Sequence, residues 1–182
     1  MTIAEFWNAQ RFSYLVTYSF NRGPRLASLH ETTITAIKKI KEELQHAPFR
    51  DQQKLEYQLR QLKEAIRSST YNKKLTSGSN KFDSTAERIA VVEKDSAVAT
   101  QLSNIVHSST GDAIFFMCPS IYRDALVFYD EHNRPVSVLN ICLECSFMET
   151  NSGIVVKANM STYEALYRLL IQLGHPIEND EN

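Results

Sequence analysis

The spacing of hydrophobic positions predicts two long amphipathic helices in the first half of the chain. In residues 28–45 and again in residues 50–68, isoleucine and leucine recur at three- and four-residue steps, with lysine and glutamate between them. Pro48 separates the two segments, because proline disfavours helix in the residue before it. Two amphipathic helices with a short link predict an antiparallel helical hairpin. Its apolar positions are Ile34, Ile37, Ile40, Leu44, Leu55, Leu59, Leu62 and Ile66.

Alternation with a period of two, or a short apolar run, predicts strands elsewhere in the chain. Residues 11–20 alternate aromatic and β-branched side chains, and a short helix is expected before them at residues 3–8. The remaining predicted strands are residues 89–92, 113–117, 125–129 and 136–143.

Two further helices are expected outside the helical hairpin. Asp95 or Ser96 is suited to cap a helix that continues to His107. Ser161 is suited to cap a last helix, which Gly174 would end. Residues 148–153 are expected to be irregular.

The order of these elements predicts an α+β fold, with a mostly antiparallel sheet, helices packed on one side and an N-terminal helical hairpin. We expect a single domain over residues 1–182. It would divide into a strand plus helical hairpin at 1–75 and an α+β core at 85–177, joined by a polar loop. The acidic end, 178–182, is expected to be disordered. Whether the helical hairpin packs on the core stays open.

The composition of the chain disfavours nucleic acid and membranes as partners. The net charge of −1 gives no overall attraction for nucleic acid or an anionic membrane. No run of about 18 apolar residues is present to span a bilayer. The odd number of three cysteines, with no recognisable signal peptide, predicts a reducing compartment, and we expect a cytoplasmic protein.

Three cysteines near one predicted β-hairpin are the most distinctive chemistry in the sequence. Cys142 and Cys145 form a C-x-x-C motif, and equal counting from the turn places Cys118 at the same end of the hairpin. The thiols can be small buried apolar groups, zinc ligands, or the redox centre of a thiol enzyme. A fourth zinc ligand would come from His107, His175, Glu144 or water.

The same region resembles a segment shared by uncharacterised bacterial proteins. The resemblance rests on Cys118-Pro119, on Arg123 and the run 125–130, and on the run 141–145. It covers about the last third of the chain. It implies a common hairpin and carries no activity with it.

The remaining polar residues complete no enzyme motif. Asp124 and the neighbouring acidic residues are expected at solvated strand ends. The helical hairpin carries an excess of basic residues without interleaved aromatics, which does not favour nucleic acid. Our leading hypothesis is therefore a non-catalytic protein-interaction domain, of the kind found in immunity proteins or inhibitors. The alternative is a zinc-binding or thiol-enzyme site at Cys118, Cys142 and Cys145.

Overall fold

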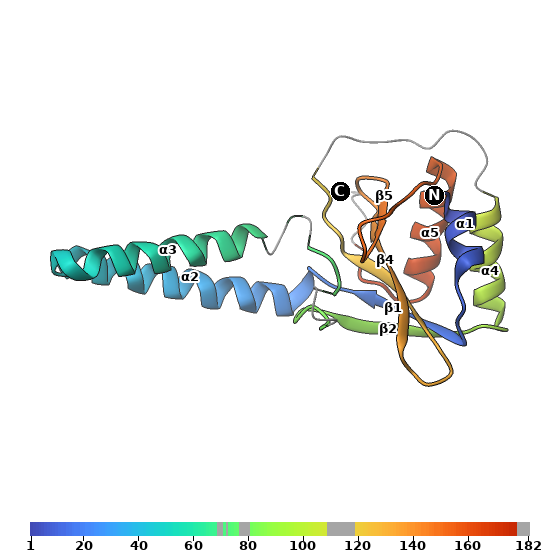
Figure 1. Ribbon diagram of the computed structural model, residues 1–182, viewed down its shortest axis with the longest axis horizontal. Coiled ribbons are helices and arrows are strands. Elements are labelled where there is room, and N and C mark those ends of the chain that lie inside the picture. The colour runs from blue at the N-terminus through green and yellow to red at the C-terminus, as the bar shows by residue number, and fades with distance from the viewer. Residues whose placement is uncertain (69–70, 72, 77–80, 109–118, 178–182) are drawn as a thin grey trace.

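The protein consists of a body, built on one sheet, and an arm of two helices that projects from it (Figure 1). The computed structural model describes residues 1–68, 71, 73–76, 81–108 and 119–177. We call α2 (Gly23–His46) and α3 (Phe49–Ser68) the arm, and the other described residues the body.

Within the described residues, the sheet has six antiparallel strands: β1 (Tyr14–Ser19), β2 (Glu87–Glu93), β3 (Asp124–Tyr129), β4 (Pro135–Cys142), β5 (Phe147–Thr150) and β6 (Val155–Val156). Their order across the sheet is β2-β1-β3-β4-β5-β6. The β3–β4 turn is closed by Asp130, whose Oδ1 accepts hydrogen bonds from the backbone N–H groups of His132 and Arg134, both at 2.9 Å.

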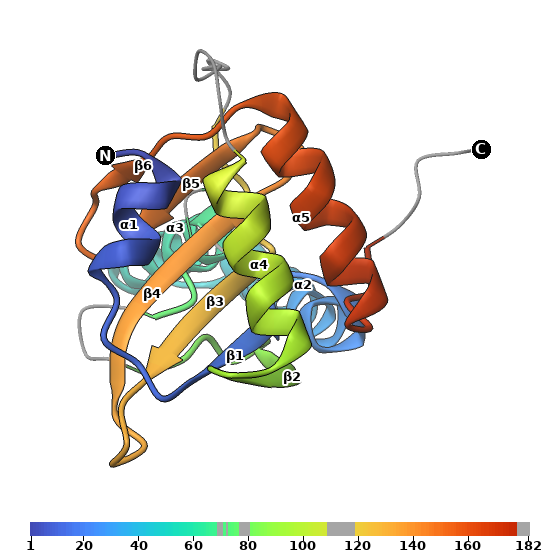
Figure 2. The same ribbon diagram turned by 90° about the vertical axis from the view of Figure 1, so that its right-hand side faces the viewer.

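Three helices cover one face of this sheet: α1 (Ile3–Ala9), α4 (Ala97–His107) and α5 (Met160–Gln172) (Figure 2). Each helix begins at a polar cap: Thr2, Ser96 and Asn159 accept from backbone N–H groups of the first turn. The larger core cluster lies between these helices and the sheet, around Phe128 and Leu166, which are both fully buried.

The other face of the sheet carries a second, smaller core cluster. Leu75 lies over it with no exposed surface, and its backbone N–H donates to Asn140 Oδ1 at 2.8 Å. Tyr122 enters the same cluster from the segment that precedes β3. The cluster contains Val16, Phe20, Leu75, Tyr122, Ala125, Val127, Tyr129, Val138, Cys142 and Cys145.

The arm lies on the side of the sheet opposite the three body helices, as the two views agree (Figures 1 and 2). Its helices run side by side, and neither contains a buried residue. The strands that the arm connects, β1 and β2, are adjacent antiparallel neighbours. The arm is thus a long insertion between two paired strands. The sequence left open whether the helical hairpin packs on the core, and in the structure it projects from the body.

The predicted α+β class and antiparallel sheet are confirmed. Two local predictions are wrong. Residues 148–153 were expected to be irregular, but residues 148–150 belong to β5, because they pair with β4. The cap of α5 is Asn159 and not Ser161. The sheet joins the two expected sub-divisions, because β1 from residues 1–75 pairs with β2 and β3 from residues 85–177. The predicted strand 113–117, Cys118 and the tail 178–182 lie outside the described residues. No helix in the described part of the chain is long and apolar enough to cross a membrane.

Candidate functional site

Cys142 and Cys145 lie at the turn between β4 and β5, and both are buried in the second core cluster. Cys142 ends β4, and Cys145 lies within the turn that leads to Phe147. The Cys145 Sγ atom lies 3.7 Å from the carbonyl oxygen of Pro119. Cys118, the third cysteine of the predicted site, lies outside the described residues, so the expected three-thiol grouping stays a prediction.

The two histidines considered as zinc ligands lie on the other face of the sheet. His107 ends α4, where its Nε2 is 3.1 Å from Asn8 Oδ1 of α1. His175 follows α5, and its Nδ1 is 2.6 Å from Asp124 Oδ1. Asp124 alternates along β3 with Leu126 and Phe128, so its side chain points to the helix-covered face, whereas Cys142 belongs to the opposite cluster.

Glu144, another candidate ligand, forms an ion pair with Arg123. Among the residues that the structure describes, no group of three histidine, cysteine or acidic side chains is arranged to hold a metal ion. The described part of the site therefore supplies two buried thiols, and a zinc site stays a prediction.

A buried network of charged groups joins the arm to the body, and sequence reasoning missed it. Asp124 is 1% exposed, and its two carboxylate oxygens pair with His175 and with the guanidinium of Arg22. Arg22 Nη1 also donates to the carbonyl of Pro176 at 2.9 Å. The expectation of a solvated Asp124 is wrong, because Arg22 at the root of the arm and His175 after α5 both lie against this first residue of β3. A single acidic residue at a strand end gives no sequence signal of such partners.

A second polar network holds the root of the arm from the side of α3. Asn21, at a φ of 54°, takes the left-handed conformation that redirects the chain into α2, and its N–H donates to Thr85 Oγ1 at 2.7 Å. Thr85 N–H in turn donates to Asp83 Oδ1 at 2.8 Å, and Lys73 Nζ is 2.6 Å from Asp83 Oδ2. Burial would raise the pKa of Asp83, but the bonds from Lys73 and Thr85 outweigh it and hold that pKa below its usual value.

Tyr122 is the most strongly perturbed acid near the cysteines. Its hydroxyl donates to Glu149 Oε2 at 2.5 Å, and Lys74 Nζ lies 2.9 Å from Glu149 Oε1. Burial, followed by the neighbouring Glu149 carboxylate, raises the pKa of Tyr122 far above its usual range. The phenol therefore stays protonated at neutral pH and serves as a hydrogen-bond donor to Glu149, which does not suit it to act as a general base.

A surface groove of about 370 Å³ lies between α1 and α4. Its amide groups are held by neighbours: Gln10 Nε2 donates to the carbonyl of Phe6 at 2.7 Å, and Asn8 Oδ1 faces His107. Among the described residues, those that line it include no cysteine, histidine or carboxylate, so no imidazole or carboxylate of the lining is placed to activate the hydroxyl groups of Thr100 and Ser103. The lining residues are Trp7, Asn8, Gln10, Phe12, Lys94, Ala99, Thr100, Ser103 and Asn104.

Comparisons with protein-family models, with curated proteins and with solved structures find no match for this chain. The Asp124 and Asp83 networks both hold the root of the arm on the body, so they have a structural role. The arm itself has no structural role in the body.

Proposed function

We propose that the chain is a non-catalytic protein-interaction protein and that the arm is the element that binds its partner. The observation that carries this proposal is that α2 and α3 bury no side chain. Two adjacent antiparallel strands need only a short turn between them. Residues 23–68 therefore add no core to the body, and a projecting helical pair is suited to contact a second molecule.

The apolar stripe of the arm is incompletely covered. Ile37, Leu59 and Leu62 belong to the seam between the helices, yet they are only partly buried. Water exclusion around such side chains is worth about 25 cal/mol per Å² of apolar surface buried. A partner that packs on the arm would gain this contribution, which the isolated helical hairpin does not obtain.

Phe49 gives the tip of the arm a further binding group. Its side chain is 83% exposed, the largest value among the exposed large hydrophobic side chains of the described residues. A protruding aromatic side chain is the kind of group that acts as an anchor in protein interfaces. A role as an inhibitor, in which such a tip enters a recess of the target, is compatible with this shape.

The test is to excise the arm and to compare binding with folding. In the excised variant, residues 23–68 are replaced by a short turn, and the body is expected to keep its cooperative thermal unfolding. Cross-linking in cells that make the protein, followed by affinity purification, should recover a specific protein with the full chain and lose it with the excised variant.

A matched pair of single substitutions sharpens this test. Phe49→Ala removes the exposed side chain at the tip, whereas Ile154→Ala removes an exposed apolar side chain of the body. We expect recovery of the partner to fall for Phe49→Ala and to be unchanged for Ile154→Ala. A partner that binds the excised variant as well as the full chain would show that the arm is not the binding element.

A further inference from the structure

The seam between α2 and α3 divides the arm into two broad faces. Seam positions recur at alternating three- and four-residue steps in both helices, as in an antiparallel coiled coil. The positions that flank the seam on one side of both helices form one continuous face, which we call the basic face. It contains Ala27, Glu31, Ile34, Lys38, Lys41, Gln45, Gln53, Glu56, Arg60, Lys63 and Arg67.

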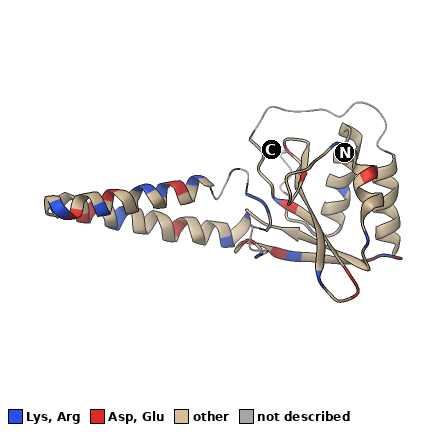
Figure 3. Cartoon of the chain, viewed as in Figure 1, with Lys and Arg blue, Asp and Glu red and all other residues tan. Residues whose placement is uncertain are grey.

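The charges on the basic face are unbalanced. Lys38, Lys41, Arg60, Lys63 and Arg67 oppose only Glu31 and Glu56, and all seven side chains are exposed. Within the described part of the chain, none of these five basic side chains has an ion-pair partner within 4.0 Å. Figure 3 shows basic residues along both helices of the arm.

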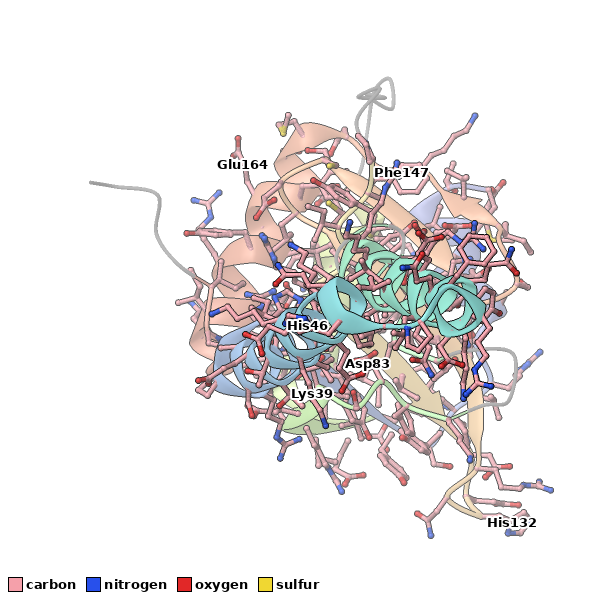
Figure 4. All side chains as sticks on the ribbon, turned by 90° about the vertical axis from the view of Figure 1, so that its left-hand side faces the viewer. Lys39, His46, Asp83, His132, Phe147 and Glu164 are labelled. Carbon is pink, nitrogen blue, oxygen red and sulfur yellow. The ribbon has the colours of Figure 1, made fainter. Side chains whose placement is uncertain are left out.

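The opposite broad face is nearly balanced and largely paired. Lys39 Nζ lies 3.9 Å from Glu43 Oε1, and Arg25 Nε lies 3.4 Å from Glu87 Oε1 at the root of the arm. Figure 4 looks along the arm from its tip and labels Lys39 on this face. The two faces of one helical hairpin thus differ in free positive charge, although they share the same seam.

The excess charge argues against a second copy as the occupant of the basic face. Residues 23–68 carry nine basic and six acidic side chains, whereas the whole chain has a net charge of −1. Two arms laid side by side would bring like charges together, which disfavours association. An acidic partner would instead be attracted to this face.

The apolar groups of the basic face indicate what kind of acidic partner fits. Ile34 is 45% exposed near the middle of α2, and the seam leucines beside it are only partly buried. The residues of this face include no aromatic side chain on which a nucleic-acid base could stack. A partner with both carboxylates and apolar side chains at helical spacing satisfies both the charges and the uncovered seam.

We infer that the basic face binds an acidic amphipathic helix of the partner protein, which packs along the seam between α2 and α3 and completes a three-helix bundle. This inference rests on the proposed function and adds to it the face and the chemical class of the partner. In the complex, carboxylates of the added helix pair with the basic side chains that lack an ion-pair partner, and its apolar stripe covers Ile34 and the seam.

The probe is a synthetic peptide of about four heptads, with leucine at the two core positions of each heptad and glutamate at the flanking positions. Its like charges prevent pairing with itself. Binding to the full-length protein is followed by fluorescence anisotropy of the labelled peptide, and folding of the peptide by circular dichroism. A labelled single-stranded oligonucleotide is measured in parallel.

Two variants, each with three charge reversals, distinguish binding through the basic face from binding elsewhere on the arm. The first, Lys41→Glu with Arg60→Glu and Lys63→Glu, inverts the basic face. The control, Lys39→Glu with Arg50→Glu and Lys54→Glu, makes the same change in net charge elsewhere on the arm. Thermal unfolding of both variants establishes that the body is intact.

We expect the peptide to bind and fold, with affinity reduced at least about tenfold by the first reversal and less than about threefold by the control. Binding should also weaken in about 1 M salt, where the Debye length is about 3 Å. Equal losses in both variants, no peptide binding, or oligonucleotide binding with the same dependence on the basic face would each overturn the inference. If excision of the arm abolishes partner recovery in cells but the first reversal does not, the proposed function stands and this inference fails.

Discussion

The arm and the body contain helices with the same periodicity of apolar residues, but they use it differently. In the body, α5 buries Leu166, Leu169 and Leu170 against the sheet. In the arm, α2 and α3 have equally regular stripes and bury no residue. In the described part of the chain, each arm helix packs along its length against the other and meets the body at the root, whereas α5 lies over a sheet and beside α4. Burial thus depends on the number of neighbours, and periodicity alone does not report it.

Truncation of one large side chain in each region should lower the stability of the body far more than that of the arm. Phe128 is fully buried and contacts Phe6, Trp7 and Phe12 through edge-to-face ring pairs. Phe128→Ala is expected to lower the free energy of unfolding by about 4 kcal/mol, as large-to-small core substitutions do. Leu59→Ala in the arm should shift the main urea transition by less than about 0.5 kcal/mol. Equal effects would mean that the arm and body unfold as one unit.

The second prediction concerns the connection between the two regions. Asp124→Asn removes the buried negative charge that faces both Arg22 and His175. Because loss of one partner leaves the other buried charge uncompensated, we expect unfolding to become easier by about 3 kcal/mol. Urea denaturation measures this value. An isosteric variant as stable as the parent would show that the network contributes no net stability.

The third prediction tests the second core cluster and the metal hypothesis together. If Cys142 is only a small buried side chain, Cys142→Ser should cost about 1 kcal/mol in urea denaturation. Native mass spectrometry of the parent protein should then give the mass of the bare chain. An added zinc mass that disappears in this variant would instead establish the thiolate site.

The smallest expected effect is a pH dependence at the root of the arm. The pKa of Asp83 is lowered in the folded protein from its ordinary value of 3.8, so its ionised form stabilises the fold above that value. This stability should be lost as the pH falls through the folded-state pKa. Compared with Asp83→Asn, the parent should therefore lose stability more steeply in acid. Parallel pH profiles of the two proteins would contradict a stabilising role for the Asp83 carboxylate.

The sequence predicts most of the fold because local signals were strong where the elements are long. The arm helices have clear three- and four-residue steps, and β3 and β4 are apolar-rich runs on either side of a turn that Asp130 closes. β5 was missed because its four residues, with Glu149 and Thr150 at the end, have too short an apolar pattern to separate a strand from a loop.

The candidate sites were less predictable, since their partners come from distant parts of the chain. Arg22, Asp124 and His175 are far apart in sequence, and nothing in the local pattern of any one of them indicates the other two. The C-x-x-C motif spans the end of β4, and the turn after Cys142 brings Cys145 into the same core cluster. It could not predict that His107 and His175 would lie across the sheet, because strand order and helix placement decide that.

Because the arm is long, a small rotation at its root produces a large displacement of its tip. A helix of 24 residues extends about 36 Å at 1.5 Å per residue. A rotation of about 10° at Asn21 and Arg22 would therefore carry the tip through roughly 6 Å, about one turn of a helix. Small changes in the hydrogen bonds around Thr85 or Asp124 would be magnified at Phe49. The polar contacts at the root of the arm thus determine how precisely Phe49 at the tip is positioned.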